Sequence, residues 1–310
     1  MFGIPQAFTV FYGLMTDSTS QWIEAMRAER YDVAWAMAER TLAERDPATR
    51  DDPSLPYHRR WVWDGRGFDD RHVLVRCYNG LGDTIQFARY LPYLAQRANV
   101  VTLEAQPSLV PLLAPIEGVD TVVPFDPAHP LPPAECDIEI TELAFALRMA
   151  PDGALPGYLT AARAVVPSGT IALCHGSGDW DADRDIPAEL FEPLCALAPC
   201  ITLVAAPCSL SVLNPDGCPM DMEITAALVA SADLVITVDT MIAHLAGALC
   251  RQTWLLLKAE PDWRWNPAAR SSPWYPTMRL FAQPAPGDWN GVIAEVEREL
   301  AIRLGGIRGE

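Results

Sequence analysis

Apolar residues follow two different spacings along the chain, and together these predict alternating strands and helices from residue 72 onward. Short apolar runs such as HVLVRCY (72–78), bounded by glycine or proline, are typical of buried strands. Segments such as EITAALVASA (223–232) instead repeat apolar residues every three to four positions, which indicates helices. Further strands are predicted at 99–105, 119–125, 136–143, 170–176, 201–206, 233–238 and 253–258, and further helices at 83–96, 108–116, 188–198, 240–249 and 289–304. Such alternation indicates a parallel sheet with helices on its faces.

The first part of the chain has a purely helical pattern. Residues 18–46 carry apolar side chains at spacings of three and four, with a bend near Tyr31, which predicts a helical hairpin. The stretch YDVAWAMAERTLAERDP (31–47) resembles the second helix of a tetratricopeptide repeat. An array of such repeats needs about three units to be stable. A single unit therefore indicates a TPR-like remnant that packs on the main body.

A stretch rich in proline and glycine at 150–170 interrupts the alternation and divides it into two halves of similar size. The sequence thus predicts an α/β protein with two Rossmann-like parallel-sheet domains that face a cleft. The last helix is expected to pack back toward the first of them. The predicted parts are a hairpin and linker at 1–62 and two Rossmann-like domains at 63–160 and 161–310.

Composition narrows the class of protein. The net charge of −17 argues against non-specific nucleic-acid binding, which depends on basic surfaces. Apolar runs are shorter than the roughly 20 residues of a transmembrane helix. The first 15 residues lack the basic region and cleavage site of a signal peptide. The eight cysteines form no C-x-x-C pair and several lie in apolar runs, so we expect buried free thiols and a cytoplasmic protein.

The stretch ADLVITVDTMIAHLAGAL (232–249) places polar side chains where a strand passes directly into a helix. Asp239 and Thr240 fall at a helix N-terminus, whose free N–H groups and dipole attract anions. Thr240 could donate its hydroxyl to a phosphate, whereas Asp239 is expected to cap the helix or hold the loop. His244 follows one turn later on the same face. The alternative is an ordinary helix cap with a partly buried histidine.

The stretch YNGLGDTIQFARYLP (78–92) contains a glycine loop after the first strand. Gly80 and Gly82 would let the backbone turn tightly and approach a ligand. Asp83 then begins the helix and would point into the cleft, although an aspartate is also a common helix cap. The spacing is not G-x-G-x-x-G, so a nicotinamide dinucleotide site fits poorly.

Together these stretches resemble the heptosyltransferase family, and most of all the glycosyltransferase domain found behind tetratricopeptide repeats in bacterial proteins. The resemblance covers about residues 60–300 and includes VTLEAQPSLVPLLAPIEGVD and PDWRWNPAARSSPWYPTMRLF. It implies a GT-B fold, with 63–160 as the acceptor domain and 161–310 as the nucleotide-sugar domain. It also implies a nucleotide-sugar donor, no metal cofactor, and Asp83 as general base.

The resemblance also assigns donor-site residues in the second half. The loop HGSGDWDADRDIP (175–187) has Ser177 and, three residues before its proline, Arg184, which would clamp the diphosphate. Glu223, 16 positions before Asp239, corresponds to a glutamate that holds the nucleotide ribose; its alternative is a solvated first-turn residue.

Three features depart from the family pattern: of the usual N-D-R-x-R-S loop only Asp183-Arg184 remain, and two single positions differ. Met241 replaces a small residue after the D-T pair, which narrows the approach to the helix N-terminus. Lys258 stands where proline is expected and is either a second phosphate contact or a surface lysine.

Two further motifs have both a functional and an ordinary interpretation. DAD (181–183) has the form of a metal-binding D-x-D, but such triplets are common in a chain with 40 acidic residues, so no metal is expected. Trp263, Arg264 and Trp265 offer flat faces that could stack on a base or sugar. The alternative is a rigid loop packed on the core.

The leading hypothesis is a metal-independent inverting glycosyltransferase that moves a sugar from a nucleotide sugar to a hydroxyl of a glycan, lipopolysaccharide or protein. One alternative is a catalytically inactive GT-B protein that acts as a scaffold. Another is an epimerase or hydrolase acting on nucleotide sugars.

Overall fold

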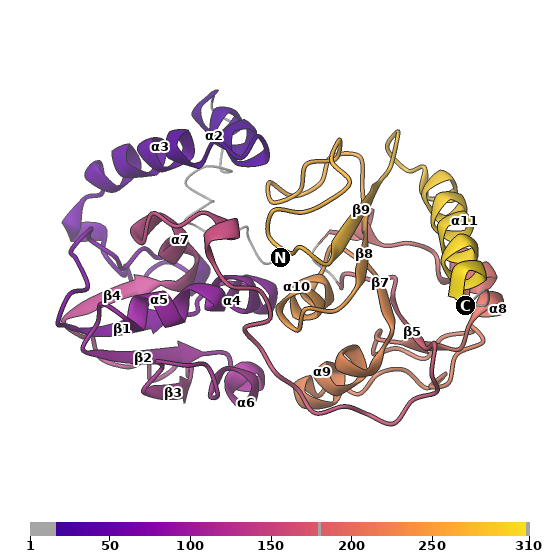
Figure 1. Ribbon diagram of the computed structural model, residues 1–310. Helices are drawn as coiled ribbons and strands as arrows, with labels where there is room; N and C mark the ends of the chain where they lie inside the picture. The colour runs from indigo at the N-terminus through magenta and orange to yellow at the C-terminus, as the bar shows by residue number, and fades with distance from the viewer. Residues whose placement is uncertain (1–16, 179–180, 308–310) are drawn as a thin grey trace. The chain divides into compact units, whose positions relative to one another are not determined.

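The computed structural model describes residues 17–178 and 181–307, and the chain divides into two compact units between Thr160 and Ala161 (Figure 1). Each unit contains one parallel sheet with helices, as the strand and helix pattern predicts. The expectation that no signal peptide is present concerns residues outside the described part.

The first unit is built on a four-stranded parallel sheet in the order β3-β2-β1-β4. The predicted strands are confirmed, and each is shorter than its apolar run. They are β1 (His72–Arg76), β2 (Val100–Ala105), β3 (Thr121–Pro124) and β4 (Cys136–Glu139).

The helices of this unit are short because prolines divide them. Pro92 and Pro111 stand in the first turns of α5 and α6, where a missing N–H costs nothing, and each follows a 3₁₀ turn. The α-helices after β1 are α4 (Leu81–Phe87), α5 (Leu91–Ala95), α6 (Val110–Leu113) and α7 (Leu143–Ala146). The 3₁₀ helices are η1 (Pro47–Thr49), η2 (Tyr57–Arg59), η3 (Ala88–Tyr90), η4 (Pro107–Leu109), η5 (Ile140–Glu142) and η6 (Pro151–Gly153).

The predicted helical hairpin is present as α2 (Asp17–Arg27) and α3 (Tyr31–Ala43). Ala25 and Ala34 are fully buried, and small side chains allow two helices to pack closely. The hairpin is fixed to the rest of the unit by an ion pair of 2.7 Å between Arg45 and Glu142, and by a hydrogen bond from Arg45 to the Trp63 carbonyl.

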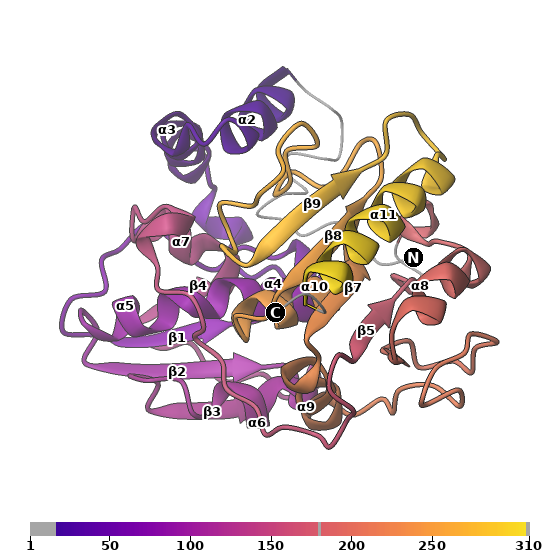
Figure 2. The same ribbon diagram turned by 45° about the vertical axis from the view of Figure 1, so that its right-hand side comes forward.

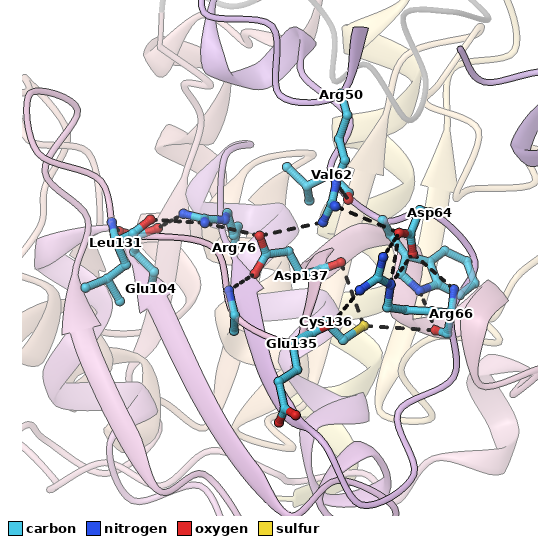
Figure 3. A network of polar contacts seen from close by, with 12 residues as sticks. Arg50, Val62, Asp64, Arg66, Arg76, Glu104, Leu131, Glu135, Cys136 and Asp137 are labelled. Atoms are coloured by element: carbon cyan, nitrogen blue, oxygen red, sulfur yellow. Dashed lines mark hydrogen bonds and ion pairs between the residues drawn. The ribbon is translucent and has the colours of Figure 1, made fainter. Parts of the chain in front are cut away.

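A buried ionic network joins three strands of this sheet (Figure 3). The Arg76 guanidinium, 1% exposed, lies 2.8 Å from a Glu104 oxygen and 3.3 Å from an Asp137 oxygen. Arg76 also donates to the carbonyl of Leu131, and the Leu131 N–H donates to Glu104. Buried charges are tolerated when they are paired and hydrogen-bonded. The network therefore fixes the loop around residue 131 against the sheet.

The second unit has a five-stranded parallel sheet in the order β6-β5-β7-β8-β9. Figure 1 shows α8 and α11 on one side of this sheet and α9 and α10 on the other. The strands are β5 (Ile171–Cys174), β6 (Cys200–Thr202), β7 (Leu234–Val238), β8 (Thr253–Leu257) and β9 (Met278–Ala282). The helices are η7 (Ala182–Arg184), η8 (Ala188–Phe191), α8 (Glu192–Leu197), α9 (Met222–Ser231), α10 (Met241–Ala248) and α11 (Trp289–Ile307).

Strand β9 is absent from our sequence-based expectations. Its five residues contain Arg279 at their second position, which interrupts the apolar run. The structure supplies a partner, because Arg279 forms a 2.8 Å ion pair with Glu299 of α11.

The last helix, α11, packs within the second unit. Its apolar face, including Trp289, Val296 and Leu300, belongs to the core of the second unit together with Leu194 of α8 and Phe281 of β9. Figure 2 shows α11 running alongside β9, against which it packs. The expectation that α11 packs back toward the first domain stays a prediction.

All eight cysteines are free thiols, as expected. Five of them are buried, Cys195 and Cys208 are partly buried, and Cys250 is exposed. The expectation of burial is therefore correct for most of them and wrong for Cys250.

Candidate functional site

The sheet of the second unit has a topological switch point between β5 and β7. The chain passes from β5 to β6 on one side and then returns to β7 on the other side of β5. Ligands of such sheets bind in the crevice beyond the carboxyl ends of the two strands where the order reverses. The loops that follow β5 and β7 meet there, and they carry the predicted residues Ser177, Arg184, Asp239 and Thr240.

Arg184 joins these two loops. Its Nη1 atom donates to the carbonyl oxygen of Asp239 at 3.0 Å and lies 3.3 Å from the Asp239 carboxylate. Its Nε atom lies 3.2 Å from Asp181. Burial alone would lower the pKa of Arg184, but the negative charges of Asp239, Asp262 and Asp181 raise it above its ordinary value. Arg184 is therefore a fixed cation, 17% exposed, at the switch point.

Asp239 holds this arginine rather than capping the helix. Its carboxyl group is buried, which raises its pKa, and the nearby Arg184 guanidinium opposes this effect. From the sequence, Asp239 could either cap the helix or hold the loop. The structure favours the second role, because Asp239 binds Arg184 of the loop that follows β5.

Asp181 binds two cations at once, a role that the sequence did not reveal. One carboxylate oxygen lies 2.7 Å from the Lys258 Nζ atom and 3.2 Å from the Arg184 Nε atom. Burial raises the pKa of Asp181, and the bond and charge of Lys258 outweigh this effect, so its pKa is lowered overall. Asp181, 77 positions earlier in the chain, thus holds the Lys258 side chain at the switch point.

Helix α10 begins at this point without a side-chain cap. Thr240 is the N-cap residue with an extended backbone, and its side chain makes no capping hydrogen bond within the described part of the chain. The first N–H groups of a helix need an acceptor, and the helix dipole favours a negatively charged one. Thr240 and Met241 are both partly exposed, so this helix start is accessible.

His244 lies below the helix start and is buried. Its Nδ1 atom and the Tyr275 hydroxyl are hydrogen-bonded at 3.0 Å, and its ring stacks on Trp265 with centroids 5.7 Å apart. Tyr275 is seated by Gly247, where an added Cβ would come within 2.2 Å of the tyrosine ring. Tyr275 was not predicted from the sequence as a site residue, because only its position in a proline-bounded loop indicated a role.

The DWRW loop is also buried. Trp265 is fully buried against His244, and Trp263 packs edge-on against Trp274. The guanidinium of Arg264 lies 4.4 Å from the Trp263 ring centre. This burial favours the packing interpretation of the loop over direct stacking on a base or sugar.

Ser177 is engaged within its own loop. Its backbone N–H and its hydroxyl both donate to the same oxygen of Asp185, at 2.6 and 2.7 Å. The following Gly178 has a φ of 74°, a conformation that favours glycine. In this arrangement Ser177 shapes the loop that presents Arg184.

Glu223 is an exposed residue in the first turn of α9, whose N-cap is Asp221. The carboxylate of Asp221 accepts the N–H groups of Glu223 and Ile224 at 2.9 and 3.0 Å. Because α9 leads into β7, it runs opposite to the strands, and its N-terminus lies at the same sheet edge as the start of α10.

The first unit has its own switch point, between β1 and β4. Helix α4 starts there at Leu81, two residues earlier than predicted, with Gly80 as its N-cap. Asp83 is partly exposed and accepts the Gly80 N–H at 3.0 Å. Gly80 has an ordinary φ of −69°, and Gly82 is not among the glycines with positive φ. The turn therefore does not need glycine's conformational freedom, although an added Cβ at Gly80 would press on Asp83 at 3.2 Å.

Glu139, the last residue of β4, lies at this same switch point and was not identified from the sequence. Its side chain is 3% exposed. One oxygen, Oε2, accepts the N–H and the hydroxyl of Thr141, whereas Oε1 has no hydrogen-bond partner in the described part of the chain. Burial outweighs the Thr141 hydrogen bonds and raises the pKa of Glu139 to about 8.

This burial predicts a pH-dependent stability. Between pH 4.5 and 8 the unfolded chain releases the Glu139 proton while the folded protein keeps it, so folding becomes less favourable as the pH rises. We expect this group to lower the free energy of unfolding by roughly 3 kcal/mol between pH 5 and 8. Urea denaturation across this range should give a flatter pH dependence for Glu139→Gln than for the wild type and for the exposed control Glu117→Gln. Parallel curves would show that Glu139 ionises normally.

Two features were sought among the described residues: a cluster of metal ligands and a membrane-spanning helix. No group of three or more His, Cys, Asp or Glu side chains among them is arranged to hold a metal ion. Within the same residues, no helix combines the length and apolar character needed to cross a membrane.

No protein-family model matches the chain, and no curated protein matches it significantly. Solved structures do match. The ADP-heptose lipopolysaccharide heptosyltransferase II of E. coli is 15% identical, with a TM-score of 0.52 over 75% of this chain and 99% of its own. A glycosyl transferase family 9 protein of Veillonella parvula is 11% identical, with a TM-score of 0.57 over 77% and 98%. The iron-containing dodecameric glycosyltransferase TibC of enterotoxigenic E. coli is 14% identical, with a TM-score of 0.53 over 76% and 78%. The chain therefore has the α/β, GT-B-like fold of the heptosyltransferases.

Proposed function

We propose that the chain is an inverting glycosyltransferase that binds a nucleoside diphosphate sugar in its second unit. The observation that carries this proposal is the uncapped start of α10, which lies at the switch point beside the cations Arg184 and Lys258. Exposed N–H groups, a helix dipole and a guanidinium together suit a diphosphate. A heptosyltransferase with this fold, TibC, has been solved with ADP-D-β-D-heptose, which supports a donor of this class.

The positions of the side chains support the following donor contacts. Arg184 and Lys258 bind the diphosphate oxygens, and Thr240 donates its hydroxyl beside the helix N–H groups. Glu223, exposed at the same sheet edge, binds the hydroxyls of the ribose. His244 and Trp265 support the helix from below rather than reaching the donor.

In the transfer itself, the acceptor hydroxyl attacks the anomeric carbon from the face opposite the diphosphate. A new carbon–oxygen bond forms as the bond to the diphosphate breaks, and the hydroxyl proton passes to Asp83. Arg184, Lys258 and the α10 N-terminus stabilise the negative charge that develops on the departing nucleoside diphosphate. The acceptor is a hydroxyl of a glycan, of lipopolysaccharide or of a protein.

In this proposal Asp181 competes with the donor phosphate, because Arg184 and Lys258 converge on one of its oxygens. The donor must displace this carboxylate. We therefore expect Asp181→Asn to bind nucleoside diphosphate about three- to tenfold more tightly, a gain typical of one or two partly exposed ion pairs. Isothermal titration calorimetry measures the change, with the exposed neighbour Asp183→Asn as the matched control. Weaker binding by Asp181→Asn would mean that Asp181 positions the cations instead.

A thermal-shift screen tests the proposed function directly. A ligand that binds only the folded state raises the melting temperature, and at about 100 times its Kd it adds roughly 2.7 kcal/mol of stability. The probes are ADP, GDP, UDP, CDP and their sugar conjugates, with inorganic pyrophosphate for the phosphate contacts alone. We expect one nucleotide series to raise the melting temperature. No shift with any nucleotide would refute the proposal.

A further inference from the structure

Glu139 and Asp83 lie at the same switch point of the first unit. Glu139 ends β4, whereas Asp83 is in the first turn of α4, the helix that follows β1, the strand beside β4. Helix α4 also packs against η5, which directly follows Glu139. The carboxyl groups of the two residues interact electrostatically.

Among the described residues, the other groups that interact with Glu139 are acidic or neutral. Glu142 of η5 carries a carboxyl group that interacts with it, and Cys77, which follows β1, contributes a buried thiol. Burial raises the pKa of this thiol, so it stays neutral. Thr141 contributes two hydrogen-bond donors without a charge.

Two described cations of neighbouring segments, Arg45 and Arg76, form ion pairs with other acids. Arg45 forms its 2.7 Å ion pair with Glu142. Arg76, the register partner of Glu139 on β1, directs its guanidinium to Glu104 and Asp137. Glu139 therefore has no ion-pair partner among the described residues, in contrast to Glu142.

The hydrogen bonds place the proton of the neutral Glu139 side chain. Oε2 accepts both donors of Thr141, which is the role of the carbonyl-type oxygen. The proton then belongs on Oε1, which is buried and has no partner in the described part of the chain. A buried polar atom left unpaired is costly, and native structures keep few of them.

We propose that Glu139 is a positioning residue that sets the strength of the Asp83 base through the charge it carries. The inference rests on the proposed function of Asp83. A charged carboxyl group increases the proton affinity of a second carboxyl group nearby, because like charges disfavour ionisation. At neutral pH Glu139 is neutral, so no charge from it acts on Asp83. At alkaline pH Glu139 ionises, and its negative charge increases the proton affinity of Asp83.

The coupling is tested first without any measurement of activity. Carbon-13 NMR of labelled glutamate follows the titration of the Glu139 carboxyl in the wild type, in Asp83→Asn and in Glu117→Gln, an exposed control. We expect its pKa to be about 8 in the wild type and in the control. Removal of the Asp83 charge should lower it, because a like charge disfavours ionisation. An unchanged titration in Asp83→Asn would overturn the inference, whatever the enzyme does.

The second test is the pH dependence of kcat/KM with the donor found by the thermal-shift screen. A stronger base accelerates proton transfer, so we expect wild-type activity to rise about two- to fivefold between pH 7 and 9. Glu139→Gln resembles the neutral acid and should keep wild-type activity at pH 7 while losing this rise. If the rise persists in Glu139→Gln, another group causes it and Glu139 is structural. If no sugar transfer is detected but the NMR titration shows the coupling, the proposed glycosyltransferase function is wrong. The electrostatic coupling of Glu139 and Asp83 then still stands.

Discussion

Asp83→Asn is expected to lose about 10²–10⁴-fold in the rate of sugar transfer, the usual contribution of a general base. An amide cannot take the proton of the acceptor hydroxyl. Its oxygen can still accept the Gly80 N–H that Asp83 accepts at 3.0 Å, so the start of α4 should remain intact. Transfer is measured by release of nucleoside diphosphate in the presence of acceptor, and donor binding by calorimetry.

The matched control is Asp46→Asn. Asp46 also accepts a backbone N–H at the start of a short helix, from Ala48 at 3.0 Å, but it belongs to the N-terminal segment. This variant should transfer sugar at the wild-type rate. If Asp83→Asn also turns over at the wild-type rate, Asp83 is a helix-start residue and the base is another group. If Asp83→Asn no longer folds, as seen by circular dichroism, its role at the helix start is larger than proposed.

Arg184→Ala is expected to lose both stability and donor affinity. Asp239 is buried, and its ion-pair partner in the structure is Arg184 at 3.3 Å. Breaking a buried pair leaves a charge without compensation and costs about 3–5 kcal/mol. A charge-assisted hydrogen bond to phosphate contributes about 1.5–3 kcal/mol, so donor affinity should fall by roughly 10- to 100-fold. Urea denaturation and calorimetry measure the two losses separately.

A double variant separates the two roles of Arg184. In Arg184→Ala/Asp239→Asn the buried carboxylate is replaced by a neutral amide, so most of the lost stability should return. Donor affinity should stay low, because the phosphate contact is still missing. Recovery of donor affinity together with stability would mean that Arg184 only holds the loop and that the diphosphate binds elsewhere.

The sequence determined most of the secondary structure and the class of fold. Strands β1 and β7 follow from continuous apolar runs, and α9 from apolar residues at helical spacing, because both signals are local. The alternation of the two then requires parallel sheets. Positions of Asp83 and Thr240 at helix starts also follow from local sequence, since each comes soon after a strand ends.

Strand β9 marks the limit of this local information. Arg279 breaks its apolar pattern, and only its pairing with β8 and the ion pair to Glu299 make it a strand. The environment of the site residues was likewise decided by tertiary structure. Asp181 appeared as part of a doubtful metal motif, whereas in the fold it binds Lys258, 77 residues away. Glu139 appeared as an ordinary strand residue, whereas in the fold it is a buried acid with a raised pKa beside Asp83. Charge state and accessibility depend on burial and on neighbours distant in the chain, and for this physical reason the sequence could name candidate residues but not their partners.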